Sequence, residues 1–257
     1  RSGGRAMRIN RFLAACGLGS RRKMDELIAS GRVRINGQPL DGPGQPVMPG
    51  RDVVTLDGKV LGLQDEQGVW LLHKPVGFLT TMADPQGRPT VAEFVAGLPV
   101  RVFPVGRLDM DTSGLLLFTN DGKLAHRLAH PKHGVEKEYR VIVRGRLGLE
   151  AKAALEEGVL LEEGMTSPAR VLLRDAVPGG SGLHSGEDVF HLVIHEGWKR
   201  QVRRMCDAVG LPVIQLARVR YDFLRLDGLA PGGLRKLAAD EVARLQAGTA
   251  HRGRGRA

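Results

Sequence analysis

Four polar residues stand close together just before an apolar run of the chain. Arg107, Asp109, Asp111 and Thr112 precede the segment 114–119, GLLLFT, which reads as a buried strand. Charged side chains at the mouth of a buried strand are typical of active sites, because the scaffold is rigid and the loop is accessible. A surface loop with local Arg–Asp pairing explains the same segment, so the residues alone leave both interpretations open.

Histidines and glycines elsewhere favour no second chemistry. His126 and His130 share a helix face, but Pro131 ends that helix before His133 and no acidic residue completes a zinc-protease pattern. We therefore predict histidines that lie on the surface or face a ligand, and no metal. The glycine-rich stretch 177–182 is not followed by Lys-Ser or Lys-Thr, so no nucleotide phosphate loop is predicted.

The elements that must position the polar loop are short strands and helices. Strands are predicted at 69–74, 101–105, 114–119, 137–145, 167–174, 188–196 and 212–223, and helices at 90–97, 122–129, 149–157, 199–209 and 239–246. Several strands follow one another with no helix between them. The predicted fold class is therefore α+β, with a mixed, mainly antiparallel sheet flanked by helices.

The first sixty residues have a pattern of their own, namely helix, turn, helix and hairpin. Apolar residues recur at helical spacing over 9–16. Ser20 is a suitable N-cap for the second helix, and Asn36-Gly37 supplies a hairpin turn. A further pair of short strands is predicted within 49–63. This part is therefore predicted to be a small α/β domain.

Basic residues gather in this small domain. Arg21, Arg22 and Lys23 stand together in the first turn of its second helix, and Arg32 and Arg34 share one face of the following strand. Cations in the first turn of a helix oppose its dipole, and an external anion would offset that cost. A solvated basic face is the alternative.

The composition of the whole chain also favours a polyanionic partner. The 257 residues carry a net charge of +10, and residues 1–62 hold 11 Lys and Arg against 5 Asp and Glu. Binding that neutralises phosphates is driven by the release of counterions. Two cysteines need no disulfide framework and indicate a cytoplasmic protein. No run of about 18 apolar residues and no signal-peptide core occur, so no membrane association is predicted.

The residues 8–38, RINRFLAACGLGSRRKMDELIASGRVRINGQ, resemble the small RNA-binding domain named after ribosomal protein S4. In that family the cationic second helix and the turn after it contact RNA. The resemblance therefore implies RNA contacts for Arg21, Arg22, Lys23, Arg32 and Arg34. It indicates the ligand and leaves the reaction open.

A second resemblance concerns the reaction. The residues 106–122, GRLDMDTSGLLLFTNDG, resemble the signature of the pseudouridine synthases that modify ribosomal RNA. In that family the Asp of the RLD triplet is the nucleophile, which implies this role for Asp109. Asp111 falls at a position that the motif leaves variable. EKEYRVIVRG, residues 136–145, resembles the second motif of the family, which implies that Tyr139 lies against the target base.

The residues 196–224, EGWKRQVRRMCDAVGLPVIQLARVRYDFL, resemble the third motif of these enzymes. The resemblance implies that Arg203 pairs with the catalytic carboxylate and that Leu216 packs on the site. Arg107, Lys199 and Arg200 are expected RNA contacts. Trp198 is equally consistent with stacking on RNA and with packing.

The reaction of this family breaks the bond from N1 of uracil to the sugar, turns the base and joins C5 to C1′. The uridine must leave the stack to be reached, and the ionised carboxylate attacks C1′ of the ribose or C6 of the ring. No external atom is consumed, so no cofactor or metal is expected. The motifs are most similar to those of members acting on the large subunit. The expected partner is thus 23S ribosomal RNA in a large-subunit assembly intermediate, with the protein a monomer.

Three alternatives remain at this stage. They are the same reaction on 16S ribosomal RNA, a non-catalytic RNA-binding ribosome-assembly factor, and a nucleoside glycosidase that releases free base. The predicted domains are an RNA-binding domain at 7–62, a catalytic domain at 68–247, and a basic disordered tail at 248–257 that is too polar and glycine-rich to pack.

Overall fold

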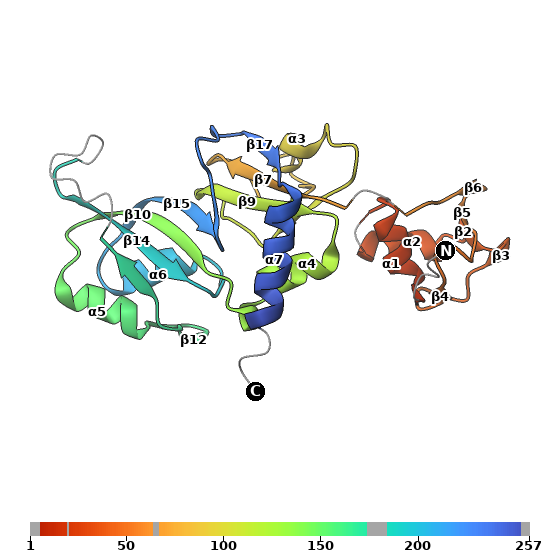
Figure 1. Ribbon diagram of the computed structural model, residues 1–257. Coiled ribbons are helices and arrows are strands. Elements are labelled where there is room, and N and C mark those ends of the chain that lie inside the picture. Colours follow the sequence, from red (N-terminus) through yellow and green to blue (C-terminus); the bar gives the residue numbers. More distant parts are fainter. Residues whose placement is uncertain (1–5, 20, 64–66, 174–183, 253–257) are drawn as a thin grey trace. The chain divides into compact units, whose positions relative to one another are not determined.

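The computed structural model describes residues 6–19, 21–63, 67–173 and 184–252. The chain divides into two compact units (Figure 1). One comprises Arg1–Gln67 with Leu98–Val102, and the other Gly68–Gly97 with Phe103–Ala257. The predicted N-cap Ser20 and the glycine-rich stretch 177–182 lie outside the described residues.

The first unit has two helices and two small antiparallel sheets. Its elements are β1 (Met7–Arg8), α1 (Ile9–Ala15), α2 (Arg21–Ala29), β2 (Val33–Ile35), β3 (Gln38–Pro39), β4 (Pro46–Val47), β5 (Val54–Leu56) and β6 (Lys59–Val60). One sheet has the order β3-β2-β5-β6, and β1 pairs with β4 in the other. Asn36 and Gly37 have φ values of 50° and 78° between β2 and β3, which confirms the predicted hairpin turn.

A single apolar core holds the helices of this unit on its strands. It is formed by the buried residues Ile9, Phe12, Leu13, Met24, Ile28, Val33, Ile35, Val47 and Val54. Cys16 is half-buried against this core, and burial raises the pKa of its thiol to about 11. The thiol is therefore protonated and unreactive at neutral pH.

The second unit is built on a nine-stranded mixed sheet. Its strands are β7 (Val69–Lys74), β8 (Phe103–Val105), β9 (Ser113–Thr119), β10 (Lys137–Arg144), β13 (Arg170–Leu172), β14 (Glu187–Ile194), β15 (Val213–Tyr221), β16 (Leu224–Arg225) and β17 (Leu234–Lys236). The main path is β13-β14-β10-β15-β9-β7-β17, with β8 paired to β9 and β16 to β15. Among the paired strands of the described residues, β9–β15 is the one parallel pair. The predicted α+β class is confirmed.

Five α-helices of this unit flank the sheet in the described residues: α3 (Ala92–Val95), α4 (Gly122–Ala129), α5 (Leu149–Glu157), α6 (Gln201–Ala208) and α7 (Ala239–Arg252), and a 3-10 helix, η1 (Pro131–His133), follows α4. A short hairpin, β11 (Leu160–Leu161) with β12 (Gly164–Met165), follows α5. Because α7 continues to Arg252, the predicted end of this helix at 246 and the disordered tail from 248 are wrong as far as 252. Once its first turns are packed, each further residue of a helix adds a hydrogen bond at little cost.

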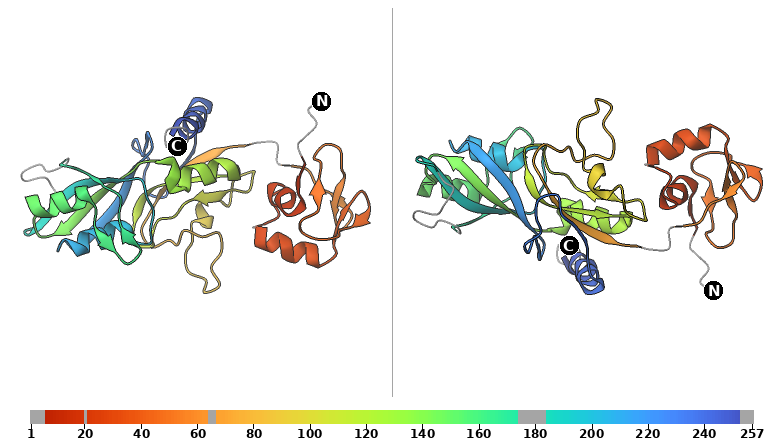
Figure 2. Two further views of the ribbon diagram at one scale, coloured as in Figure 1. Left: turned by 90° about the horizontal axis from the view of Figure 1, so that it is seen from below. Right: turned by 90° about the horizontal axis from the view of Figure 1, so that it is seen from above.

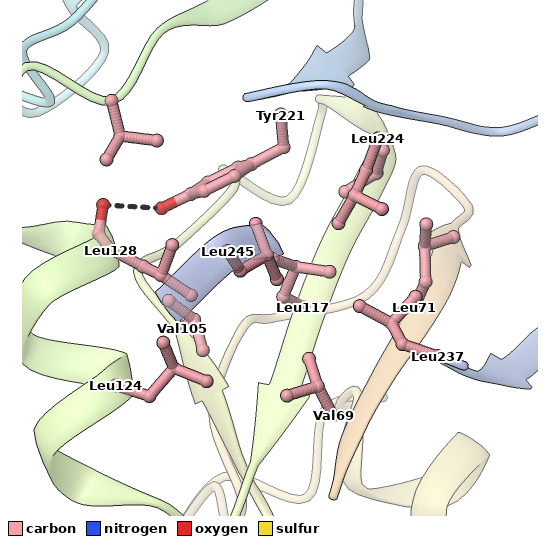
Figure 3. Packing of buried hydrophobic residues seen from close by; sticks show 12 residues of the cluster. Val69, Leu71, Val105, Leu117, Leu124, Leu128, Tyr221, Leu224, Leu237 and Leu245 are labelled. Atoms are coloured by element: carbon pink, nitrogen blue, oxygen red, sulfur yellow. Dashed lines mark hydrogen bonds between the residues drawn. The ribbon is translucent and has the colours of Figure 1, made fainter. Parts of the chain in front are cut away.

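The main core lies between β7, β9 and the helices α4 and α7 (Figure 3). Leu124 and Leu128 of α4 and Leu245 of α7 are buried against the sheet, and the Tyr221 hydroxyl donates to the Leu128 carbonyl at 2.8 Å. Figure 2 shows α7 on one side of the sheet and α6 on the other. None of the described helices is both long and apolar enough to cross a membrane.

Candidate active site

A pocket of about 500 Å³ opens in the second unit. Its lining brings together side chains from the β8–β9 loop, β10, β15 and the segment before α6. Among the residues predicted for the site, it contains Arg107, Asp109, Tyr139, Lys199, Arg200 and Leu216. Segments more than 100 residues apart in the sequence therefore meet at one concave surface.

The backbone of the loop that carries Asp109 is held by hydrogen bonds from a buried lysine. The Lys74 side chain is fully buried, and its Nζ donates to the carbonyls of Pro75, Asp109 and Thr112 at 3.0, 3.1 and 2.8 Å. Burial lowers the pKa of Lys74 to about 8, against the opposing charge of Asp109. The three donors of the ammonium are all used, so Lys74 fixes the backbone of the loop at Asp109 and at Thr112.

Two further contacts hold the outer side of this loop. The Thr80 hydroxyl donates to the Leu108 carbonyl at 2.6 Å and lies 3.1 Å from the Leu108 N–H. The Gly77 N–H donates to the Met110 carbonyl at 2.7 Å. The half-buried carboxylate of Asp109 accepts no hydrogen bond from a side chain of the described residues. The backbone is thus fixed while the carboxylate remains available to a ligand.

Arg203 does not form its expected pair. Its Nε lies 3.3 Å from the Asp111 carboxylate, and its Nη2 donates to the Asp111 carbonyl at 2.8 Å. Its Nη1 donates to the Val213 carbonyl at 3.2 Å. The predicted pairing of Arg203 with Asp109 is therefore absent, because the turn closed by the Thr112 N–H on the Asp109 carbonyl (3.0 Å) presents Asp111 to α6 instead.

Asp111, to which the sequence assigned no role, also binds Arg200. The two side chains form a bidentate pair with both distances at 3.0 Å. Burial raises the pKa of the Asp111 carboxyl, but the hydrogen bond from Arg200 and the charges of Arg203 and Arg200 outweigh it and leave the pKa below its usual value. Arg200 has a φ of 51° at the start of α6. Asp111 thus joins the loop to α6.

Tyr139 and Leu216 form the apolar side of the pocket. Tyr139 is 9% exposed on β10 and Leu216 is 6% exposed on β15, the adjacent strand. Tyr139 pairs in register with Arg218, whose Nη1 donates to the Tyr139 hydroxyl at 3.4 Å. No motif indicated Arg218, although two arginines at alternate positions of an apolar strand are a signal for a buried charge.

The approach to the pocket is basic and carries one indole. Trp198, Lys199 and Arg200 line the pocket, with Trp198 half-buried and the other two exposed. The backbone N–H of Trp198 donates to the Gln201 side-chain oxygen at 3.0 Å, and the side-chain amide nitrogen of Gln201 donates to Glu196 at 2.8 Å. This segment therefore has a fixed backbone and an aromatic face next to two cations.

The basic residues predicted for RNA contact in the first unit lie on α2 and near β2. Lys23, Arg32 and Arg34 are exposed, while the side chains of Arg21 and Arg22 are outside the described part. Arg32 forms an ion pair with Asp57, and Arg34 donates to the Gly37 carbonyl at 3.2 Å. The side chains of Lys23, Arg32 and Arg34 are therefore accessible to solvent.

The three histidines of the α4 end stand in mutual ring contact. The ring centroids of His126, His130 and His133 are 5.2 to 6.4 Å apart. Within the described ranges, no group of three or more His, Cys, Asp or Glu side chains is arranged to hold a metal ion.

Comparisons with known proteins identify the class that this fold and pocket define. Residues 68–208 match the family described as RNA pseudouridylate synthase, and residues 7–53 match the S4 domain. The chain belongs to the RNA pseudouridine synthase family, and its first unit carries an S4 domain. The resemblance found in the motifs is thereby confirmed.

Within this family, relatives with a named subunit are similar over nearly the whole chain. Ribosomal large subunit pseudouridine synthase B of Bacillus subtilis is 42% identical over 241 residues, which are 93% of this chain and 96% of that protein. The protein of the same name from Vibrio cholerae is 40% identical over 88% of this chain and 70% of its own length. A crystal structure of a pseudouridylate synthase superposes with a TM-score of 0.64 at 30% identity, covering 93% of this chain and 99% of that one.

Proposed function

We propose that this pseudouridine synthase isomerises one uridine of 23S ribosomal RNA, with Asp109 as the nucleophile. The observation that carries the proposal is the carboxylate of Asp109, which faces a pocket on a backbone fixed by Lys74 and accepts no side-chain hydrogen bond in the described residues. A free, pre-positioned carboxylate next to an aromatic ring suits attack on a flipped-out nucleoside.

The residues around Asp109 suit the remaining steps. Tyr139 forms the pocket wall beside which the uracil would lie, and Leu216 excludes water, which would otherwise hydrolyse a cleaved sugar. Arg107, Lys199 and Arg200 stand where the phosphates of an extruded nucleotide would pass. Arg203 acts through Asp111, since these two residues hold α6 against the nucleophile's loop.

The choice of 23S RNA rests on the relatives. Two proteins similar along most of the chain are named for the ribosomal large subunit. The S4 domain and the charge of +10 support binding of ribosomal RNA. A monomer acting in the cytoplasm on a large-subunit assembly intermediate completes the proposal. The same reaction on 16S RNA is the alternative that the target experiment decides.

The nucleophile is tested by Asp109→Asn in the purified full chain. The expected result is loss of turnover by at least about 1,000-fold, with unchanged RNA affinity and thermal unfolding. Asp207→Asn, an exposed carboxylate on α6 outside the pocket lining, is the matched control and retains full turnover. Turnover by Asp109→Asn near that of the wild type would remove Asp109 from this role.

The target is identified by carbodiimide labelling and primer extension across both ribosomal RNAs, in cells with and without the gene. Loss of one stop in 23S RNA is the expected result and names the uridine. A lost stop in 16S RNA moves the substrate to the small subunit. Unchanged stops in both RNAs would contradict the proposed function and favour an assembly factor.

A further inference from the structure

Arg218 is a buried arginine whose charge no carboxylate balances. It is 3% exposed in the middle of β15, and its Nε donates to the Leu115 carbonyl at 2.7 Å. In the described part of the chain no Asp or Glu forms an ion pair with it, and its buried Nη2 has no hydrogen-bond partner. Burying an unpaired charge is costly, and a neutral side chain of similar volume would fill the space at less expense. Arg218 therefore requires a reason other than packing.

The surroundings of Arg218 are aromatic and positively charged. Its guanidinium carbon lies 5.1 Å from the ring centre of Tyr221 and 6.0 Å from that of Tyr139. Two buried lysines, Lys74 and Lys137, are close enough that Arg218 adds to the effect of burial in lowering the pKa of each to about 8. The lysines have carboxylates nearby, because Asp109 and Asp111 act to raise the pKa of Lys74 and Glu196 that of Lys137, whereas Arg218 forms no ion pair within the described residues.

The contact with Tyr139 has a fixed direction. Arginine has only donors, so the Tyr139 hydroxyl must accept the hydrogen bond from Nη1. The single proton of the phenol is then directed away from Arg218. Tyr139 lines the pocket and Arg218 does not. The phenol proton, directed away from Arg218, is therefore available to an acceptor on a ligand in the pocket.

The reaction places a negative charge on the base at this position. If Asp109 attacks C1′, a bond from its oxygen to C1′ forms as the C1′–N1 bond breaks, and the electron pair stays on the uracil ring. If Asp109 attacks C6, the bond to C6 forms, the ring electrons move toward O4, and the C1′–N1 bond breaks afterwards. On both routes the ring is anionic before C5 bonds to C1′; the carboxylate of Asp109 is then released from C1′ or from C6, the C5 proton leaves, and N1 takes up a proton. Fixed donors aimed at developing charge are a large source of rate enhancement.

We propose that Arg218 is a positioning residue of pseudouridine formation, which holds the Tyr139 hydroxyl so that its proton faces the uracil and stabilises the negative charge on that base. This inference rests on the proposed function in one respect, that the uracil lies against Tyr139. It assigns Arg218 to the step in which the ring is anionic and not to RNA binding.

The kinetic test compares Arg218→Met, Arg218→Lys, Tyr139→Phe and the double variant Arg218→Met/Tyr139→Phe. The substrate is total ribosomal RNA from cells lacking the gene, tritiated at C5 of uridine, so that turnover on either subunit releases tritium. Arg218→Met is expected to lower kcat about 100-fold with KM within about twofold, and Arg218→Lys to recover about tenfold. The double variant loses no more than the worse single variant, because both changes remove one contact. Losses that multiply, or a loss confined to KM, overturn the proposal.

A control separates this effect from stability. Arg220 lies two residues further along β15 and pairs with Glu136 and Glu138. Arg220→Met is expected to lower the melting temperature at least as much as Arg218→Met while kcat stays within about threefold. If Arg218→Met fails to fold, the variants Arg218→Lys and Arg218→Lys/Tyr139→Phe replace it, and their kcat values are compared with that of Tyr139→Phe in the same way. Equal losses of kcat in Arg218→Met and Arg220→Met would mean that Arg218 has only a structural role.

A second readout needs no turnover. The chain has two tyrosines, Tyr139 and Tyr221, so protein labelled with carbon-13 at the tyrosine Cζ gives two signals, and Tyr139→Phe identifies the Tyr139 signal by its loss. That signal is expected to shift in Arg218→Lys and to remain in place in Arg220→Met. An unchanged signal in Arg218→Lys overturns the contact. If the wild type releases no tritium from either RNA, the proposed function fails, and this signal still decides the contact.

Discussion

Lys74 illustrates how a single residue sets the geometry of the site without entering the pocket. Its ammonium donates to the carbonyls of Asp109 and Thr112 in the Asp109 loop and to that of its chain neighbour Pro75. Lys137 is a second buried lysine, but it has one carbonyl acceptor, that of His195 at 3.0 Å. The two lysines share their burial and differ in what they hold, so they form a natural pair for mutation.

Lys74→Met is expected to lower the free energy of unfolding by about 1–3 kcal/mol, because three carbonyls lose their donor. It is expected to lower kcat by about 100-fold, because a misplacement of the nucleophile by about 1 Å is that costly. Lys137→Met is the control and lowers stability with less than a tenfold change in kcat. Denaturant unfolding and single-turnover rates measure both. Comparable kcat losses in the two variants would contradict the assignment of Lys74.

The titration of Lys74 adds a pH dependence with a definite sign. Its pKa is lowered from 10.5 to about 8 in the folded protein. Between pH 8 and 10.5 the unfolded chain therefore binds more protons than the folded one, so this residue's contribution to stability rises with pH. The free energy of unfolding of wild type minus that of Lys74→Met is expected to increase from pH 7 to pH 10. In the same range turnover falls, because the neutral amine has one donor fewer for the loop. A difference that is constant or falls with pH would contradict the lowered pKa.

At the scale of elements, the site depends on the close approach of β9 and β15. Gly114 pairs with Arg218 across this parallel junction, and its φ is 109°. A Cβ at Gly114 would lie 2.2 Å from the Arg218 carbonyl oxygen. This oxygen belongs to the backbone of a central strand. A shift of β9 or β15 that made room for the Cβ would therefore also move Arg218 or the end of the Asp109 loop.

Gly114→Ala is therefore expected to destabilise the second unit by more than about 3 kcal/mol, well above the cost of backbone strain alone. Gly87→Ala is the control, because Gly87 also has a positive φ (69°) but has open space around it. It is expected to cost about 1–2 kcal/mol. Thermal unfolding of both variants measures the difference. Similar melting temperatures would mean that the strands are not in close contact at this junction.

The long elements were predictable because one face or the whole element is apolar. The strand at 69–74 and the helices at 122–129 and 149–157 have the predicted bounds. β17 was missed, since its residues Leu-Arg-Lys become a strand only by pairing with β7. The predicted strand at 167–174 is shorter, Arg170–Leu172, for the same reason: its length depends on its partner β14.

The residues of the candidate site could be predicted where a sequence motif contains them. The contacts that depend on packing between distant segments could not. The motifs indicated Asp109, Tyr139 and Leu216, which line one pocket. The role of Asp111 was missed and the partner of Arg203 was wrong, because two carboxylates two residues apart are equivalent until the turn that separates them is known. The same holds for Arg218, whose partner Tyr139 is 79 residues away.

At the scale of the whole molecule, charge and chemistry are divided between the two parts of the chain. Residues 1–62 carry 11 Lys and Arg against 5 Asp and Glu, which is +6 of the net charge of +10. Every residue that lines the pocket belongs to the second unit. RNA affinity and its dependence on salt should therefore be separable from the rate of the bound complex.

Removal of residues 1–62 is expected to weaken binding to ribosomal RNA and to flatten the plot of log affinity against log salt concentration. Each lost phosphate contact lowers the slope by roughly 0.7–0.9, so a fall of at least about 2 is expected if the α2 cations Arg21, Arg22 and Lys23 bind phosphate. Filter binding between about 50 and 200 mM salt measures it. At saturating RNA the single-turnover rate should stay within about threefold of the full chain.

The full chain provides the charge-matched comparison for this deletion. Arg21, Arg22 and Lys23 replaced together by Gln are expected to account for most of the change in slope. Replacement of Arg8, Arg51 and Lys59, which are exposed in the same unit, removes the same net charge and is expected to change the slope by less than about 1. Equal slopes in the two triple variants would mean that RNA responds to the overall charge of the S4 unit, and the predicted contact surface on α2 would be wrong.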